Sequence, residues 1–334
     1  MQIEDFDPGA EPGKVRAFYQ MYAAGAPIDD PDGPPFSQHL YTSWLRDGWA
    51  GERHRLALAV DDHATPVGGC CVELDDGRNK HIGGLTLVVP PGRRRHGVGR
   101  ELLRHAARCA AGESRTMLTA EVRVDTPGAA FAAAVGARGG LIEIRRVLDL
   151  AAIPGGHLAA LRGRAEAASQ GYSLVRWTGS TPEKLLPGVA VVSTAMNDAP
   201  HNAGRKDREP DVDRIRATER HSAKLGTRRY SVAARCDGTG ELAALTQVAV
   251  DPDDPGWAFQ LITAVTRPHR GHRLGLLVKA DMLAMLTRAE PAVRSIITGN
   301  ADANKHMIAI NADLGFAVLD RWQTWDMDVA AALA

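Results

Sequence analysis

Hydrophobic positions follow strand-like and helix-like spacing in an order that occurs twice along the chain. In the first half, two stretches with helical spacing precede three short β-type runs, which predict an antiparallel meander. A glycine-containing turn, a helix, a strand, a short helix and a last strand complete a mixed α/β unit. The predicted ranges are helices at 14–25, 37–49, 102–110 and 129–135, a loop at 26–35, and strands at 55–60, 67–74, 81–89, 116–122 and 141–150.

The second half repeats this order after an Ala-rich stretch that predicts a connecting helix. Arg94 and Arg270 each lie five residues after a valine and five before a glycine, so the two copies are offset by 176 in this segment. With 334 residues, the chain has room for two cores. We expect domains at 1–150 and 171–334 with a linker helix at 151–170; the second domain has predicted strands at 172–177, 229–235, 243–250 and 257–265 and a helix at 276–286.

Composition argues against several classes of function. Lys and Arg together number 40, as do Asp and Glu, so the formal net charge is zero and gives no electrostatic attraction for nucleic acid or an anionic membrane. The four cysteines form no C-x-x-C pair, and their spacing to histidines does not suggest a zinc site, so we expect no metal. Without a signal-like start or a run of 18 apolar residues, the sequence predicts a soluble, cytoplasmic protein.

The two glycine-containing turns carry the chemistry that the sequence suggests. Each joins a strand to a helix and combines Arg, His and Gly. Glycines let the backbone approach a ligand and expose N–H groups, the helix N-terminus adds partial positive charge, and arginines add full charges. These turns predict a diphosphate site. The surroundings fit neither a dinucleotide-binding βαβ unit nor a Gly-Lys-Ser/Thr phosphate loop.

The segment from Val88 to Leu103 resembles motif A of the GNAT N-acetyltransferases, a Q/R-x-x-G-x-G/A turn, which Arg94, Gly97 and Gly99 match. The second copy resembles it too, but has Arg273 where the middle glycine is usual. The segment from Asn300 to Phe316 resembles the family's motif B. The resemblance implies these acetyl-CoA-binding residues: Val88, Val89, Arg94, Arg95, His96, Gly97, Val98, Gly99, Arg100, Val265, Arg270, Gly271, His272, Arg273, Leu274, Gly275, Asn300 and Asn304.

By this resemblance the chain is two tandem GNAT-like domains, each a mixed, mostly antiparallel sheet flanked by helices, as in the duplicated architecture of mycothiol synthase. The expected reaction is direct transfer of an acetyl group from acetyl-CoA to a primary amine of a small molecule, without a covalent enzyme intermediate. Backbone N–H groups of the strand before motif A would polarise the thioester, and Asn304 would contact the pantetheine arm. We expect a monomer or homodimer with no nucleic-acid or membrane partner.

The family's usual acid/base pair is missing from both copies. Gly83 and Phe259 stand where a glutamate is usual, and Ala132 and Asn311 stand where a tyrosine is usual. Three explanations stay open: another polar group serves, the acceptor amine needs little help beyond positioning, or catalysis has been lost. The last makes a non-catalytic CoA-binding regulatory protein an alternative, beside an acetyltransferase for protein N-termini or lysines.

Candidate replacements for the missing pair are Gln260 and Thr263, on the strand before the second turn, and His201 in a segment that also holds Asp198. They favour the second domain for chemistry, although the first domain has the more regular turn. In this fold the segment after each first strand usually covers the acceptor, and its carboxylates would suit a cationic amine or simply face solvent. They are Asp29, Asp30, Asp32, Asp207, Glu209, Asp211 and Asp213.

Overall fold

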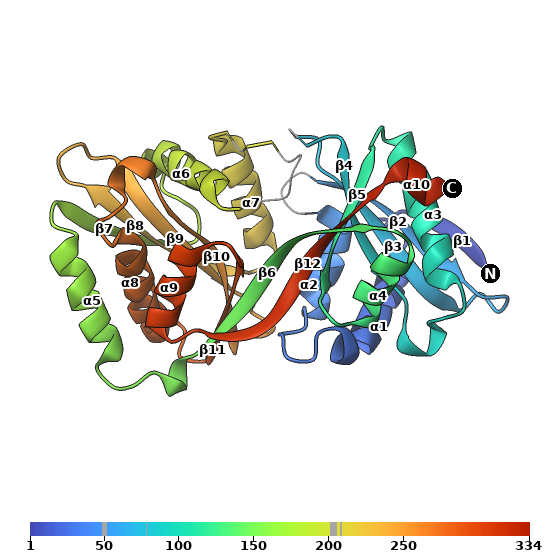
Figure 1. The fold of residues 1–334 in the computed structure, drawn as a ribbon, viewed down its shortest axis with the longest axis horizontal. Helices are drawn as coiled ribbons and strands as arrows, with labels where there is room; N and C mark the ends of the chain where they lie inside the picture. Colours follow the sequence, from blue (N-terminus) through green and yellow to red (C-terminus); the bar gives the residue numbers. More distant parts are fainter. Residues whose placement is uncertain (49–51, 78, 201–205, 208) are drawn as a thin grey trace. The chain divides into compact units, whose positions relative to one another are not determined.

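The structure, a computed structural model, describes residues 1–48, 52–77, 79–200, 206–207 and 209–334. Contacts divide the described residues into two compact α/β units (Figure 1). Unit 1 contains Met1–Ile142, Lys206 and Asp320–Ala334, and unit 2 contains the rest. The mixed, mostly antiparallel sheet flanked by helices, expected for each half of the chain, is confirmed.

Unit 1 has the strand order β1-β2-β3-β4-β5-β12, with only β4 and β5 parallel. Helices α1 and α2 pack on one face of this sheet through an aromatic-rich core. Helices α3 and α10 pack on the other face. The elements are β1 (Gln2–Phe6), α1 (Pro12–Asp29), α2 (Gln38–Asp47), β2 (Arg53–Val60), β3 (Pro66–Leu74), β4 (Ile82–Val88), α3 (Val98–Gly112), β5 (Met117–Arg123), α4 (Pro127–Ala134), β12 (Ala317–Asp328) and α10 (Val329–Leu333).

Unit 2 repeats this plan with the order β7-β8-β9-β10-β11-β6, and only β10 and β11 are parallel. Helices α5, α8 and α9 cover one face, and α6 and α7 contribute to the core on the other. The elements are β6 (Arg138–Asp149), α5 (His157–Ala168), β7 (Tyr172–Thr178), α6 (Leu186–Ser193), α7 (Val212–Lys224), β8 (Arg228–Cys236), β9 (Leu242–Val250), β10 (Trp257–Val265), α8 (Leu274–Ala289), β11 (Ser295–Ala301) and α9 (Lys305–Leu314).

The closing strands are exchanged between the two halves of the chain. β6 follows α4, yet its residues Glu143–Asp149 pair with β11 in unit 2. β12 follows α9, yet Trp322–Asp328 pair with β5 in unit 1, where Figure 1 shows β12 in red beside the teal β5. The division therefore differs from the boundary expected at residue 150. An alternating pattern specifies a strand and its buried face but not the neighbour with which it pairs.

Three local features also differ from the sequence expectation. The acidic segment Gln2–Phe6 forms edge strand β1, which the pattern did not predict. Helix α1 continues through Pro27, inside the expected loop, to Asp29. The expected linker helix belongs to unit 2, because Leu161 and Ala165 of α5 are fully buried in its core. Among the described residues, no helix has both the length and the apolarity needed to cross a membrane.

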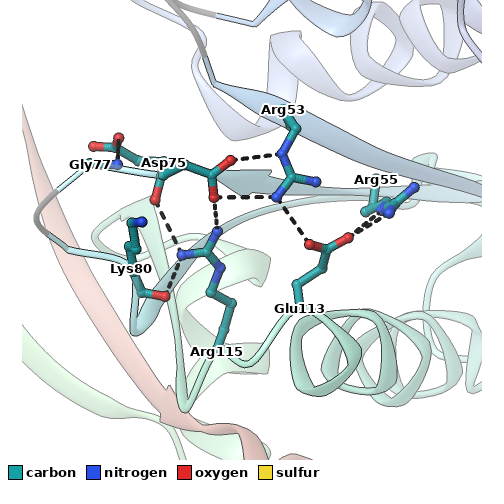
Figure 2. Close-up of polar contacts among 8 residues, drawn as sticks. Arg53, Arg55, Asp75, Gly77, Lys80, Glu113 and Arg115 are labelled. Atoms are coloured by element: carbon teal, nitrogen blue, oxygen red, sulfur yellow. Dashed lines mark hydrogen bonds and ion pairs between the residues drawn. The ribbon is translucent and has the colours of Figure 1, made fainter.

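Ion pairs hold the starts of β4 and β5 together in unit 1. Figure 2 shows the Arg115 guanidinium donating to the carbonyl oxygens of Asp75 and Lys80, just ahead of β4. It also pairs with Asp76 at 2.7 Å, and Arg53 links Asp76 to Glu113 at the end of α3. The Arg115 side chain is only 3% exposed, whereas Asp76 and Arg53 are about half exposed, so only the Arg115 end of these contacts is shielded from water. These contacts hold β4 and β5 together at the end where the two parallel strands pair.

Candidate functional site

In each unit the two parallel strands separate after a short ladder. β4 and β5 pair only at Ile82–Gly84 with Met117–Thr119. β10 and β11 pair only at Trp257–Phe259 with residues 295–297. Beyond these pairs, the backbone of β4 and β10 on this side has no ladder partner. Each strand therefore presents N–H and C=O groups to a ligand just before it enters the turn.

The two turns have the same backbone conformation despite different residues. The first contains two left-handed positions, Arg95 (φ 68°) and Gly97 (φ 83°). The second contains them at the positions 176 residues later, Gly271 (φ 89°) and Arg273 (φ 52°). Arg273, the departure from the family pattern, therefore adopts the left-handed conformation that glycine reaches more easily. The second turn therefore has left-handed residues at the same two positions as the first.

Backbone N–H groups at both turns are open to an anion. Within the described part of the chain, no hydrogen bond uses the N–H groups of Gly97, Val98 and Gly99 or those at 273–275. Val98 and Leu274 are buried, which anchors the first turn of α3 and of α8, while residues 95–97 and 271–273 are exposed. Unpaired N–H groups at a helix N-terminus form an anion site. Both turns therefore fit the diphosphate of a CoA thioester.

The turn arginines brace the backbone and are ion-paired. The Nε of Arg94 donates to the Val89 carbonyl oxygen at 2.9 Å, and its two terminal nitrogens pair with both carboxylate oxygens of Asp29. Arg270 repeats this, with Nε 3.3 Å from the Val265 carbonyl oxygen and a terminal nitrogen paired with Asp198. A diphosphate bound at either turn would compete with these carboxylates for the arginine.

The motif B asparagines are hydrogen-bonded within unit 2. Asn304 caps α9, its side-chain oxygen accepting from the Met307 N–H at 3.3 Å. The side-chain oxygen of Asn300 accepts from the Asn311 amide at 2.7 Å. His272 lies in the turn, where its carbonyl oxygen accepts from the Ser169 hydroxyl at 2.8 Å. These contacts give the asparagines structural partners, and the role expected for Asn304 toward the pantetheine arm stays a prediction.

Gln260 and Thr263 lie together on β10, but their polar atoms are already used. The Gln260 amide nitrogen donates to Thr246 Oγ1, to the Gln247 carbonyl oxygen and to the Ile262 carbonyl oxygen, at 2.7 to 3.0 Å. The Thr263 hydroxyl lies 2.9 Å from the Thr246 hydroxyl. Both side chains therefore have partners within unit 2, and the catalytic role expected for them stays a prediction. His201 lies outside the described residues, and the nearby Asp198 pairs with Arg267 and Arg270.

Glu73 of β3 supplies a carboxylate that the sequence comparison with the family pattern misses. It lies opposite Gly84 of β4, one residue from the position of the usual glutamate. A Cβ built on Gly84 would lie 3.0 Å from Glu73 Cβ and 3.3 Å from Oε2, so the absent side chain leaves the space that the carboxyl group fills. Thr86 Oγ1 donates to Glu73 Oε1 at 3.2 Å. The carboxylate thus comes from the neighbouring strand.

The surroundings of Glu73 favour its protonated form. Burial, the largest cause, and the negative charges of Glu52 and Glu121 together raise the pKa of the Glu73 carboxyl to about 7, while the Thr86 hydrogen bond lowers it by a smaller amount. A carboxyl with a pKa near 7 is matched to general acid–base work at neutral pH. In unit 2 the corresponding pair is Ala249 opposite Phe259, which offers no carboxyl.

Two acidic residues of the expected acceptor segments, Asp29 and Asp32, pair with arginines. Besides Asp29, Asp32 pairs with Arg123 at 2.7 Å, and Asp211 caps α7. The last residues of β5 border a hollow of about 400 Å³ in unit 1, at the open end of the separated strands. Its lining is polar and charged, apart from three apolar residues, and consists of Ile28, Pro31, Arg123, Val124, Asp125, Thr126, Asp320 and Arg321.

Comparison with known proteins identifies the family. The model of the acetyltransferase (GNAT) family matches residues 16–136. A solved tandem GNAT protein from the clavulanic acid biosynthesis pathway is 30% identical, with 98% of this chain and 99% of that chain covered and a TM-score of 0.80. The chain belongs to the GNAT family of acetyltransferases. The match with the solved tandem protein covers nearly all of both chains, so this chain shares its tandem architecture.

More distant structures share the GNAT fold. A GCN5-related N-acetyltransferase from Sphaerobacter thermophilus is 15% identical, with 98% and 96% of the two chains covered and a TM-score of 0.70. A glucosamine N-acetyltransferase region of a fungal β-N-acetylglucosaminidase is 14% identical, with 98% of this chain and 38% of that chain covered and a TM-score of 0.68. Comparison with curated proteins gives no match.

Proposed function

We propose that this GNAT protein transfers an acetyl group from acetyl-CoA to the primary amine of a small molecule, and that unit 1 carries out the reaction. The observation that carries the proposal is the Glu73 carboxyl, half-buried over Gly84 beside the separated strands and held by Thr86. The sequence favoured the second domain for the reaction. Because of Glu73 we assign the reaction to unit 1, whose turn matches the family pattern in full.

Each group of unit 1 has a distinct task. The N–H groups of residues 97–99 and the N-terminus of α3 bind the diphosphate. Acetyl-CoA supplies the acetyl group as a thioester, with CoA thiolate as leaving group. Glu73 accepts the proton that the ammonium form of the acceptor must lose before it attacks. The carboxylates of Glu52 and Glu121, close enough to raise the pKa of Glu73, favour a cationic acceptor.

Two buried cysteines of unit 1, Cys70 and Cys71, are consistent with direct transfer. Burial raises the pKa of the Cys70 thiol to about 12 and that of the Cys71 thiol well above its usual range. A thiol attacks a thioester as the thiolate, so neither is a competent nucleophile at neutral pH. The polar hollow at the end of β5, about 400 Å³, suits a small polar acceptor.

The test is CoA release from acetyl-CoA over a panel of primary amines. We expect release with at least one amine, and a loss of about 100-fold or more in Glu73→Gln with acetyl-CoA affinity unchanged. Glu183→Gln, a glutamate of unit 2 with an 86% exposed side chain, is the matched control and should keep full activity. If no amine releases CoA but a peptide does, the acceptor is a protein. If nothing does, the regulatory reading replaces catalysis.

A further inference from the structure

Three side chains that can bind a metal ion meet where edge strand β1 lies against helix α3 in unit 1. His105 and Cys109 are four residues apart on α3, so both project from one face of the helix. Asp5 of β1 reaches the same place from the sheet. One ligand atom from each residue lies within 4.8 Å of the other two. Imidazole, thiolate and carboxylate are the ligands that zinc takes in proteins.

The register of the sheet brings Asp5 to the helix. Asp5 is paired with Ala57 of β2, and Ala57 is paired with Cys70 of β3, so the three side chains lie in a row on one face. α3 packs on this face, because Ala57 and Cys70 share a core with Leu102 and Ala106. The small side chain of Ala57 leaves room in this row for longer side chains from the helix.

A single nitrogen of His105 contacts both other groups. Its Nε2 lies 2.7 Å from Asp5 Oδ1 and 3.4 Å from Cys109 Sγ. A protonated Nε2 donates to Asp5 and leaves only a weak contact with the sulfur. A bare Nε2 accepts from the thiol but then turns its lone pair toward the carboxylate. A cysteine–histidine–aspartate triad needs a different ring nitrogen for each partner, whereas a metal ion binds all three groups at once.

The separations are close to those of a zinc site. With zinc–ligand lengths of about 2.0–2.3 Å and tetrahedral angles, nitrogen and sulfur ligands lie about 3.5 Å apart, and nitrogen and oxygen ligands about 3.3 Å apart. The Nε2–Sγ distance of 3.4 Å fits this geometry. The Nε2–Oδ1 distance of 2.7 Å must widen by about 0.6 Å. The Asp5 side chain is 71% exposed and free to move, whereas that of His105 is 14% exposed.

The charges at this place suit a divalent cation. Burial and the charge of Asp5 raise the pKa of the Cys109 thiol, and the charges of Arg55 and Arg108 lower it. The thiol keeps its proton until a metal ion replaces it, so binding releases one proton. The thiolate and the Asp5 carboxylate then carry two negative charges, which one zinc ion neutralises.

We infer that Asp5, His105 and Cys109 form a zinc site that joins edge strand β1 to helix α3, with water as the fourth ligand. The inference is independent of the proposed acetyl transfer, because the site uses none of the residues assigned to that reaction. The expectation of no metal considered only the spacing of cysteines and histidines. Asp5, 100 residues from His105, is brought to them by the fold.

Co²⁺ is the probe, because it takes the same ligands as zinc and its thiolate complexes have a near-ultraviolet charge-transfer band. The reduced, chelator-treated full chain is titrated with Co²⁺ and then with Zn²⁺. We expect the band at one ion per chain and its loss on displacement by zinc. Cys109→Ser should abolish the band. The control is Cys236→Ser, which removes a partly exposed cysteine of unit 2 and should keep it.

The other two ligands are tested by affinity. His105→Gln and Asp5→Asn should each weaken zinc binding by about tenfold or more, since even residues that only orient a ligand contribute this much. Zinc should raise the urea midpoint of wild type but not that of Cys109→Ser. No band in wild type, an equal band in Cys109→Ser, or unchanged zinc affinity in His105→Gln would each overturn the inference. If Cys109→Ser fails to fold, His105→Gln decides it.

Discussion

Replacing Glu73 by glutamine should remove activity and yet stabilise the protein at alkaline pH. Burial and two neighbouring carboxylates raise the pKa of Glu73 from 4.5 to about 7. A group whose pKa is raised by folding contributes stability below its unfolded pKa, and that contribution is lost as the pH rises through the folded pKa. At pH 8 the ionised carboxylate therefore lowers the free energy of unfolding. Glutamine has the same shape but no charge, so it does not have this effect.

The size of this effect follows from the shift in pKa. At about 1.4 kcal/mol per unit, a rise from 4.5 to about 7 corresponds to about 3 kcal/mol at pH 8. The same relation leaves less than about 1 kcal/mol at pH 5, where the carboxyl is protonated in the folded protein and partly so in the unfolded chain. The difference between wild type and variant should therefore grow with pH.

Urea unfolding followed by tryptophan fluorescence at pH 5 and pH 8 measures this difference. Glu183→Gln is again the control and should differ from wild type by less than about 0.5 kcal/mol at both values. A Glu73→Gln protein as stable as wild type at pH 8, or less stable, would refute the raised pKa. It would also remove the reason to assign Glu73 to acid–base work.

Other predictions follow from the same contacts. Activity should fall about tenfold per pH unit below pH 7. Thr86→Val removes a hydrogen bond that lowers the pKa of Glu73, so it should move this acid side of the pH profile to higher pH. Glu121→Gln removes a charge that raises this pKa and should move it to lower pH. If the pH profiles of both variants shift in the same direction, Glu73 is not the group that titrates. Asp29→Asn, which frees the first turn arginine, should tighten acetyl-CoA binding up to about fivefold by calorimetry at low salt, and weaker binding would argue against competition. Arg115→Met should lower the free energy of unfolding by about 2–4 kcal/mol in urea, and a loss below about 1 kcal/mol would show that the ion pairs at the strand starts matter little.

Much of the fold could be predicted because its elements have strong local patterns. The predicted strand at 257–265 coincides with β10, and both turns were found from their glycines and arginines. The exchange of β6 and β12 could not be predicted, because alternation specifies a strand and not its neighbour. Strand β1 was missed because Glu4 and Asp5 weaken its apolar pattern at an exposed edge.

The functional residues were harder to predict, because they depend on pairing across strands. Glu73 was missed because it is only a single charge in an apolar strand and no family position points to it. Gln260 was chosen for its place on the strand, but its contacts with Thr246 and Lys279 arise from β9 and from α8. Lys279 lies in an apolar helical stretch, and its contact with Gln260 is seen only in the structure.

The most direct test of the proposal that unit 1 carries out the reaction introduces aspartate at equivalent positions of the two turns. Gly97→Asp and Arg273→Asp place a carboxylate at equivalent left-handed positions, where it opposes the diphosphate. With acetyl-CoA and the best amine, Gly97→Asp should reduce CoA release by about 100-fold or more, and Arg273→Asp should leave it within about threefold of wild type. If Arg273→Asp abolishes release and Gly97→Asp does not, the chemistry belongs to unit 2 and the role proposed for Glu73 is wrong.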